Sequence, residues 1–424
     1  MQLTKNQEDF VKHVYQNSSF YIRKAEQKDI LIQQLNLSEE WDKLPLVRKE
    51  ELVFDADAVL MPECIPLWLS DQLLSVYTSG TTGMCLKVYW KLADTFRSLS
   101  SLWIYRKKDF GISPNDKFCT FYSIRSVENM VKGYECLKNQ LGFTKVNLTE
   151  ERLVQIYNQM CEYEPKWLLL QPSIAVLLAA VKKKYNLGPM KQLKYIEVSG
   201  EILTEEVRKK VSGTFGCPVV NQYGSYEVNS IAYECTEGNL HCMEGNVLVE
   251  ILDHNGEAVE DGMEGEICVT SFRNTAMPFI RYKIGDRGCF CRESCSCGRK
   301  GKVLRLTEAR TTEWIITSSG RKINPYVLMH PIENINRELD DPVVQFQIIQ
   351  SGYDEFIYRI VAEPGMEHAI RGLIKENIYE KDLAGSRIYV DFCECIIPDE
   401  ETGKVTLFQS KIKEKNKKRE VCNE

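Results

Sequence analysis

The sequence lacks the features that would place the protein in a membrane, in a fibre or among disordered chains. Its most apolar window, residues 167–181, is broken by polar residues and is shorter than the ~20 residues that a spanning helix needs. The early Lys5, Glu8 and Asp9 leave no apolar signal-peptide core. Internal repeats and biased segments are missing as well. We therefore expect a cytoplasmic protein with no membrane association.

An excess of positive charge is also absent. The chain has 54 Lys and Arg against 60 Asp and Glu, and the net charge of -6 argues against nucleic acid as a general partner. The basic run Lys411–Arg419 is typical of a solvated tail. Apolar residues at 43% and charged residues at 27% are usual for a globular protein. At about 150 residues per domain, the 424 residues predict two or three domains.

Helical and strand patterns alternate along most of the chain, which predicts parallel sheets covered by helices. After a collar of short helices over residues 1–60, expected helices lie at 93–110, 127–141, 151–162, 174–185 and 205–215, and expected strands at 117–122, 145–148, 166–170, 195–198 and 219–222. Helical periodicity stops near residue 230. The expected fold is α/β, with a large N-terminal domain (1–308) of two parallel-sheet lobes and a β-rich lobe (about 230–308), then a small α+β domain (309–424) with a basic tail (411–424).

One loop rich in hydroxyl groups and glycine stands out after the short apolar run 73–76. Such a loop turns several N–H groups toward one anion, and its Ser and Thr side chains add neutral donors. Phosphate is the natural ligand, although the Gly-x-x-x-x-Gly-Lys spacing of a Walker A loop is missing. Its residues are Tyr77, Thr78, Ser79, Gly80, Thr81, Thr82 and Gly83.

A second candidate stretch, residues 221–227, follows an expected strand, where ligands bind in parallel sheets. Tyr223 would stack on a base, Gly224 would allow close approach, and Glu227 would hold Mg²⁺ against phosphates. The alternative is a helix N-terminus at which Glu227 only complements the dipole.

Further candidate positions carry single roles. Asp286, beside a glycine, suits the two hydroxyls of a ribose, or is a plain turn residue. The backbone of Ser199, Gly200 and Glu201 would read an adenine edge. Lys404, after a glycine in a polar loop, is either a solvated lysine or a catalytic one.

Taken together and in this order, these stretches resemble the adenylate-forming superfamily of acyl-CoA synthetases, and most closely its phenylacetate-CoA ligase branch. The match runs over nearly the whole chain, from the phosphate loop at 77–83 through Tyr223-Gly224-x-x-Glu227 and Tyr282-x-x-Gly285-Asp286 to Lys404. Residues 309–325 are similar to the hinge that precedes a mobile C-terminal domain, and they include Arg310.

The resemblance implies an activity, its cofactors and its site. A carboxylic acid, aromatic by analogy with the branch, would react with ATP and Mg²⁺ to give an acyl-adenylate, which a thiol, most simply coenzyme A, would intercept. Lys404, Glu227 and Thr78 would be catalytic. The nucleotide would contact Thr78–Gly83, Ser199–Glu201, Gln222, Tyr223, Gly224, Asp286 and Arg310, and the acyl group would contact Tyr122, Ser123, Ile124, Ser199 and Tyr226. The branch also implies a homodimer.

Departures from the family pattern keep other functions open. Met84-Cys85-Leu86 displaces Lys87 from its usual place, Tyr226 replaces a threonine, and Ala309 replaces the hinge glycine. One alternative is a stand-alone adenylating enzyme that loads a carrier protein or another acceptor. A second is a non-catalytic nucleotide sensor or scaffold.

Six of the sixteen cysteines fall in two clusters. Cys235 and His241 lie just beyond Glu227, and Cys295 and Cys297 lie just after Asp286, so the β-rich lobe would bring the four together. One imidazole and three thiolates suit a closed, structural Zn²⁺ site, and some members of the branch carry a similar arrangement. A reduced, metal-free lobe is the alternative, and the spare candidate ligands are Cys242, Cys289 and Cys291.

Overall fold

The computed structural model describes residues 3–53, 56–77, 86–122, 133–144, 148–308, 315–320, 322–323, 325–339, 342–378, 383, 385–397 and 406–412. Contacts group nearly all of these residues into two compact units, which part between Glu308 and Ile315. Each unit has its own apolar core. The predicted fold class, α/β with a large N-terminal domain and a smaller C-terminal one, is confirmed.

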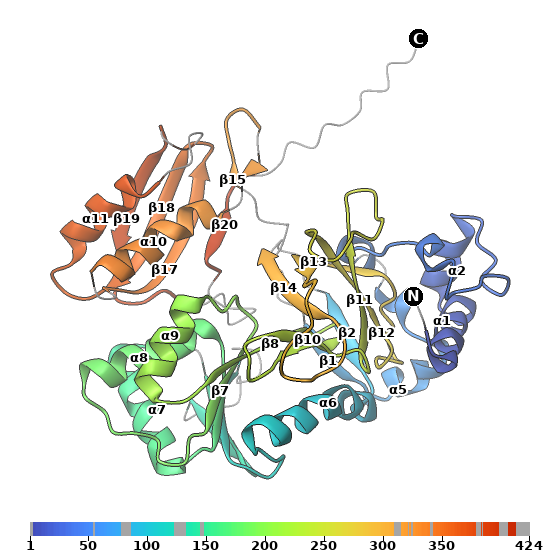
Figure 1. The fold of residues 1–424 in the computed structure, drawn as a ribbon, viewed down its shortest axis with the longest axis horizontal. Helices are drawn as coiled ribbons and strands as arrows, with labels where there is room; N and C mark the ends of the chain where they lie inside the picture. Colours follow the sequence, from blue (N-terminus) through green and yellow to red (C-terminus); the bar gives the residue numbers. More distant parts are fainter. Residues whose placement is uncertain are drawn as a thin grey trace. The chain divides into compact units, whose positions relative to one another are not determined.

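A single sheet of twelve strands runs through the first unit, so the expected β-rich lobe continues the same sheet as the parallel strands (Figure 1). Its order is β11-β12-β13-β14-β10-β9-β8-β7-β6-β3-β5-β4. Pairing is parallel from β5 through β3, β6 and β7 to β8, and antiparallel elsewhere. The strands are β3 (Phe118–Tyr122), β4 (Tyr134–Leu137), β5 (Gln140–Thr144), β6 (Trp167–Leu170), β7 (Tyr195–Ser199), β8 (Val219–Ser225), β9 (Asn229–Glu234), β10 (Leu240–Cys242), β11 (Val247–Leu252), β12 (Gly265–Ser271), β13 (Tyr282–Phe290) and β14 (Val303–Glu308).

The helices around the parallel strands begin and end at residues that suit helix termini. They are α6 (Leu92–Phe110), α7 (Glu150–Tyr163), α8 (Pro172–Lys184) and α9 (Glu205–Phe215). Thr204 caps α9 by accepting a hydrogen bond from the Val207 backbone N–H, and Gly216 ends the same helix in the left-handed conformation, at φ +70°. Helix α8 packs against both α7 and α9.

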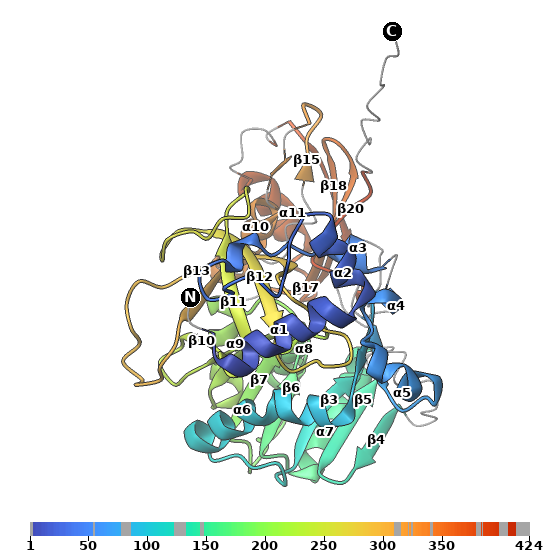
Figure 2. The same ribbon diagram turned by 90° about the vertical axis from the view of Figure 1, so that its right-hand side faces the viewer.

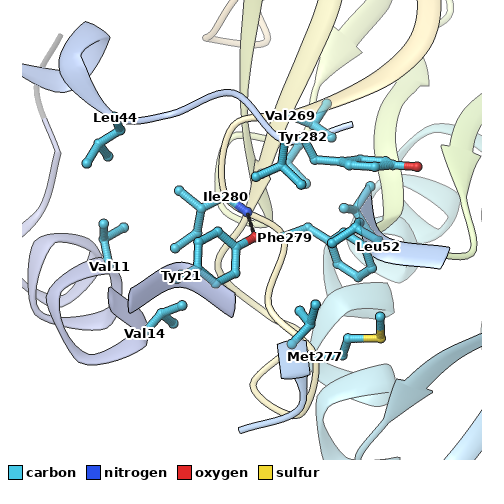
Figure 3. Packing of buried hydrophobic residues seen from close by; sticks show 14 of the residues in the cluster. Val11, Val14, Tyr21, Leu44, Leu52, Val269, Met277, Phe279, Ile280 and Tyr282 are labelled. Atoms are coloured by element: carbon cyan, nitrogen blue, oxygen red, sulfur yellow. Dashed lines mark hydrogen bonds between the residues drawn. The ribbon is translucent and has the colours of Figure 1, made fainter. Parts of the chain in front are cut away.

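Short N-terminal elements cover the antiparallel part of the sheet and share its core (Figure 3). Tyr21, which is fully buried, accepts a hydrogen bond from the Ile280 backbone N–H at 2.9 Å and donates one to the Pro278 carbonyl at 3.1 Å. This hydroxyl therefore joins the N-terminal helices to the segment before β13. The elements are α1 (Lys5–Asn17), α2 (Ser19–Glu26), α3 (Lys49–Val53), α4 (Ala56–Val59), α5 (Ile65–Leu69), and the hairpin of β1 (Leu74–Tyr77) with β2 (Lys87–Trp90).

One predicted helix, over residues 127–141, is wrong in its described part. Residues 134–144 form the antiparallel pair β4 and β5, which turns at Lys138 with φ +52°. Strand β5 also pairs along its length with β3, and Phe143 is fully buried. Sheet hydrogen bonds and burial therefore override the local helical pattern. The expected strand at 145–148 lies almost wholly outside the described residues.

The second unit has helices against a four-stranded sheet with the order β19-β18-β17-β20 (Figure 2). Strands β17 and β18 form a long antiparallel hairpin, and the outer strands pair parallel to them. The elements are β15 (Ile315–Ile316), β16 (Lys322–Ile323), α10 (Tyr326–Glu338), β17 (Val343–Gly352), β18 (Glu355–Ala362), α11 (Glu367–Glu376), β19 (Arg387–Phe392) and β20 (Phe408–Ser410). Across the described part of the chain, no helix has the length and apolar character needed to cross a membrane.

Candidate nucleotide and metal sites

The predicted nucleotide-binding stretches meet at the carboxyl ends of β7 and β8. These strands are parallel neighbours, and their register places Ser199 opposite Gln222. Ser199 is the last residue of β7, while Gln222, Tyr223 and Gly224 lie near the end of β8. Residues from two distant parts of the sequence therefore lie side by side where ligands bind in parallel sheets.

The loop after β7 is anchored to helix α8 by its carboxylate. Glu201 accepts hydrogen bonds from the backbone N–H and the hydroxyl of Ser173, both at 2.9 Å. Ser173 is in the first turn of α8, where unpaired backbone N–H groups favour a negative charge. The Glu201 side chain is thus engaged by the protein, and the contact of this loop's backbone with adenine stays a prediction.

Two sequence motifs of the site exchange hydrogen bonds. The Tyr223 hydroxyl donates to Asp286 Oδ2 at 2.7 Å, and the Tyr282 hydroxyl donates to Glu227 Oε1 at 3.0 Å. Each motif thus supplies one tyrosine that holds the carboxylate of the other. The structure brings together Tyr223, Glu227 and Asp286, which we predicted as ligands of a nucleotide, and adds a role for Tyr282 that the sequence did not reveal.

These contacts require the sheet to curl. Strand β13, which begins at Tyr282, is four places from β8 in the strand order, or about 19 Å across a flat sheet at ~4.8 Å per strand. A hydrogen bond from Tyr282 to Glu227, at the end of β8, is possible only if the antiparallel strands turn back toward β8. Figure 1 shows β11 to β14 set at an angle to β7 and β8.

Gly224 has a local structural reason to be glycine. A Cβ at this position would lie 2.2 Å from the backbone carbonyl oxygen of Asn229, on the facing strand β9. Asn229 itself has φ +60° at the tight connection between β8 and β9. The close approach that we predicted for a nucleotide is therefore already needed by the protein's own backbone.

The expected phosphate loop is flanked by described residues on both sides. Tyr77 and Lys87 are paired in the β1–β2 hairpin, and the Lys87 ammonium lies 5.1 Å from the centre of the Tyr89 ring. Trp90, at the end of β2, donates its indole N–H to the Tyr226 carbonyl at 2.9 Å. This bond joins the strand after the loop to the segment that carries Glu227.

Several predicted site residues lie outside the described residues. They are Thr78, Ser79, Gly80, Thr81, Thr82, Gly83, Ser123, Ile124, Arg310 and Lys404. Tyr122 ends strand β3, but its side chain is also outside the description. The roles of these residues stay predictions.

A second candidate site consists of four potential metal ligands, one from each of Cys235, His241, Cys295 and Cys297. Their ligand atoms all lie within 4.8 Å of one another, and the described residues contain no other group of this kind. The Cys235 and Cys295 sulfurs are 3.6 Å apart, and Cys297 Sγ is 3.3 Å from His241 Nε2. Zinc to sulfur bonds of about 2.3 Å in a tetrahedron place two sulfurs about 3.8 Å apart. The donor set and its spacing therefore fit Zn²⁺.

Hydrogen bonds already act on the sulfur atoms of this cluster. Burial raises the pKa of Cys235 to about 11. Burial also acts to raise the pKa of Cys295, but N–H and S–H donors, among them the Asn239 amide at 3.2 Å, outweigh it and lower that pKa. The Arg299 backbone N–H donates to Cys297 Sγ at 3.4 Å. Such donors favour thiolates, which are the form that binds metal.

Arg299 holds the loop between β13 and β14 to the rest of the first unit, a role that sequence reasoning missed. Its guanidinium pairs with Asp109, lies 4.0 Å from the centre of the Tyr105 ring, and donates to the Tyr233 carbonyl at 3.2 Å. The spare candidates Cys242 and Cys289 are buried outside the cluster, and Cys289 accepts a hydrogen bond from Arg305. The loop is therefore held through Arg299 as well as through the ligand cluster.

Comparison with known proteins identifies the class to which this fold and site belong. The profile of the AMP-binding enzyme family matches residues 12–277, more than half of the chain, so the protein belongs to that family. The profile of the CapK C-terminal domain matches residues 315–411. The resemblance to adenylate-forming enzymes that we read from the sequence is confirmed.

Individual relatives lie in the same branch. Phenylacetate-coenzyme A ligase of Thermus thermophilus is 27% identical over 256 residues, which cover 57% of this chain and 56% of that protein. Protein CapK of Staphylococcus aureus is 23% identical over 383 residues, 88% of this chain and 80% of that protein. Phenylacetate-coenzyme A ligase of Escherichia coli is 23% identical over 356 residues, 81% and 75% of the two chains. The alignment thus spans little more than half of the Thermus enzyme and most of the other two.

Solved structures show the same fold. A crystal structure of 2-hydroxyisobutyryl-CoA ligase in the postadenylation state has a TM-score of 0.73 at 17% identity, covering 96% of this chain and 88% of that one. The anthranilate CoA ligase AuaEII, in complex with anthranoyl-AMP, has a TM-score of 0.55 at 13% identity, covering 78% and 65%.

Proposed function

We propose that the protein activates a carboxylic acid with ATP and passes the acyl group to a thiol, most simply coenzyme A. The observation that carries the proposal is the meeting of Tyr223, Glu227 and Asp286 through crossed hydrogen bonds at the end of β8. These residues offer an aromatic face, a buried carboxylate and a second carboxylate, the groups that a base, a metal-bound phosphate and a ribose require. Family membership and the ligases among the relatives support the same reaction.

The reaction has two steps with separate requirements. First, a carboxylate oxygen of the acid attacks the α-phosphorus of ATP, the bond to the bridging oxygen breaks, and pyrophosphate leaves. Glu227 would hold Mg²⁺, which neutralises charge on the phosphate oxygens, while Thr78–Gly83 and Lys404 would supply donors and positive charge to the same oxygens. Second, the thiolate attacks the acyl carbon, and AMP leaves with the electrons of the broken carbon to oxygen bond.

An aromatic acid is our proposal for the substrate class. Phenylacetate-coenzyme A ligases among the relatives support it, while the exposed Tyr226 ring beside Glu227 would narrow or cover the acyl pocket. The match over most of the chain to protein CapK, a relative whose name specifies no ligase, leaves open the other candidate, transfer of the acyl group to an acceptor other than coenzyme A. The homodimer and the cytoplasmic location stay predictions.

Pyrophosphate exchange over a panel of aromatic and aliphatic acids tests the proposal, followed by addition of coenzyme A to the acids that react. Exchange with aromatic acids and formation of a thioester are the expected results. Exchange without thioester formation would support the carrier-protein alternative. No exchange with any acid would refute the proposed adenylation activity and favour a nucleotide sensor.

Lys404→Ala separates the two steps. We expect it to lose ~10²–10³-fold in adenylation, the usual cost of removing one stabiliser of a charged transition state, and to keep thioester formation from supplied acyl-adenylate. Lys375→Ala, which changes an exposed lysine of α11, is the matched control and is expected to retain both steps. Unimpaired pyrophosphate release by Lys404→Ala would contradict the assignment.

We also propose that Cys235, His241, Cys295 and Cys297 bind one structural Zn²⁺, supported by the fit of their spacing to a tetrahedron. When bound, the metal would cross-link β9, β10 and the loop before β14, and it would take no part in the reaction of the substrate. Metal analysis of protein purified without chelator is expected to give close to one equivalent of zinc. Cys295→Ser should lose the zinc, whereas Cys291→Ser, four residues away and outside the cluster, should keep it. Loss of zinc in both variants, or in neither, would contradict this ligand set.

A further inference from the structure

The contact between Tyr282 and Glu227 is buried at both ends. Only 1% of Tyr282 and 5% of Glu227 are exposed, and the hydroxyl lies 3.0 Å from Oε1 of the carboxylate. A buried carboxylate is costly unless each oxygen finds a partner. The tyrosine satisfies one oxygen, Oε1, and restrains the orientation of the carboxylate.

Three features hold Tyr282 rigidly in place. Its backbone lies in register with Val269 on β12, and its ring packs at 63° against Phe279 with the ring centres 5.2 Å apart (Figure 3). On the other edge, the Val47 backbone N–H donates to the Arg281 carbonyl and the Lys283 N–H donates to the Val47 carbonyl, both at 2.9 Å. The tyrosine therefore stands between two backbone segments and has little freedom to move.

The residue before Tyr282 carries backbone strain that the surroundings sustain. Arg281 has φ +48°, in the left-handed region that few side chains adopt, and only 2% of it is exposed. Its guanidinium donates to the carbonyls of Asp42 and Leu44 at 2.8 Å each and pairs with Glu250 at 3.0 Å. Strain of this kind persists where the fold over-determines it, and it gathers at functional positions.

We propose that Tyr282 is a positioning residue for Glu227: its hydroxyl orients the carboxylate so that Oε2 meets the divalent cation bound to ATP. The inference rests on the proposed function, because it takes Glu227 as the metal ligand. Removal of a group that orients a metal-binding carboxylate in this way typically lowers metal affinity or activity about 10–100-fold.

Nucleotide binding with and without Mg²⁺ tests the inference independently of turnover. ATP is titrated against wild-type protein and Tyr282→Phe by isothermal titration calorimetry, once with Mg²⁺ and once with EDTA. We expect the Mg²⁺-dependent gain in affinity to fall about 10-fold or more in the variant, with the Kd in EDTA unchanged. A purely structural role would weaken binding equally in both buffers.

Tyr157→Phe is the matched control, because Tyr157 is also fully buried and donates its hydroxyl to a backbone carbonyl, that of Gly188, at 2.8 Å. Thermal unfolding of both variants compares the stability that each loses with its buried hydroxyl. Tyr157→Phe should keep the wild-type gain in nucleotide affinity from Mg²⁺. Glu227→Gln supplies a second test. Glu227→Gln alone should lose the Mg²⁺-dependent gain in nucleotide affinity, and adding Tyr282→Phe to it should cause no further loss.

The outcomes separate the inference from the proposed function. An unchanged Mg²⁺ gain in Tyr282→Phe overturns the positioning role alone, whereas a full gain in Glu227→Gln overturns Glu227 as the metal ligand and the positioning role with it. Wild-type protein that binds the nucleotide but exchanges pyrophosphate with no acid overturns the proposed function and leaves the positioning role to be decided by the titration. Wild-type protein that does not bind the nucleotide overturns both.

Discussion

Replacement of Glu197 by glutamine should be among the most destabilising single changes in the first unit. Glu197 is fully buried in β7 and accepts four hydrogen bonds, two from the Arg106 guanidinium and one each from the hydroxyls of Tyr195 (2.9 Å) and Tyr233 (3.1 Å). Burial, followed by the nearby Glu197 charge, raises the pKa of Tyr195, so its hydroxyl stays a donor. Glutamine keeps the shape but removes the only charge that balances Arg106 in this network.

The expected loss follows from the burial of the cation. Arg106 is 6% exposed, and its guanidinium lies against the rings of both Trp103 and Trp167, at 4.5 and 4.7 Å from their centres. Removing one partner of a buried ion pair costs about 3–5 kcal/mol because the remaining charge has no compensation. At ~1.4 kcal/mol per tenfold change, the folding equilibrium should shift by roughly 10²–10⁴-fold.

Urea unfolding at pH 7, followed by tryptophan fluorescence, measures the loss directly, because Trp103 and Trp167 flank the guanidinium. Glu205→Gln is the matched control. Glu205 also pairs with an arginine, Arg208, but its side chain is 73% exposed, so we expect a loss below about 0.5 kcal/mol. A Glu197→Gln loss below about 1 kcal/mol would refute the reasoning. The double replacement Arg106→Met and Glu197→Leu should cost less than Glu197→Gln, because it leaves no buried charge.

Two further predictions concern single positions. Gly224→Ala should lower stability by about 1–3 kcal/mol and reduce pyrophosphate exchange, because its Cβ would overlap a facing carbonyl. The control is Gly213→Ala in α9, where a Cβ would have no atom within 4 Å, and this variant should not lower the unfolding temperature. Partial burial of Asp116 opposes ionisation, yet hydrogen bonds from Lys166 (2.5 Å) and from the Ser113 N–H lower its pKa. At any pH above ~3.9, the pKa of an unfolded Asp, the free energy of unfolding of the wild type should therefore exceed that of Asp116→Asn by about 0.5–1 kcal/mol. The difference should vanish as the pH falls through the lower pKa of Asp116 in the folded state. Urea unfolding at pH 7, 5, 3 and 2 checks this, and a difference that does not shrink as the pH falls below about 3.9 would contradict it.

The sequence predicted elements with strong periodicity and the order of the motifs. Helix α9 has the expected bounds and strand β7 is one residue longer than expected, because capping residues and short apolar runs are local signals. The pair β4 and β5 was missed because its hydrogen bonds depend on β3, which lies elsewhere in the chain. Local pattern does not report such tertiary pairing.

The candidate site shows the same division. The residue types at Tyr223, Glu227 and Asp286 indicated a nucleotide, and the Cys and His spacing indicated a metal. The partners that hold these groups were not predictable, because Tyr282 and Glu227 are 55 residues apart and Tyr223 and Asp286 are 63 residues apart. Gly224 carried the right signal for close approach, but the approaching group is the backbone of β9.

The curl of the twelve-stranded sheet has a consequence for how such an enzyme diversifies. Glu227 lies in the tight connection between β8 and β9, and Asp286 lies in β13, so strand pairing within one sheet sets the separation between the residues proposed to hold the phosphate-bound metal and the ribose. Of the residues expected to contact the acyl group, Tyr226 lies in this connection and takes no part in strand pairing. A change at such a position can alter the acid that is accepted while the spacing for the nucleotide stays constant, which lets one scaffold serve many acids.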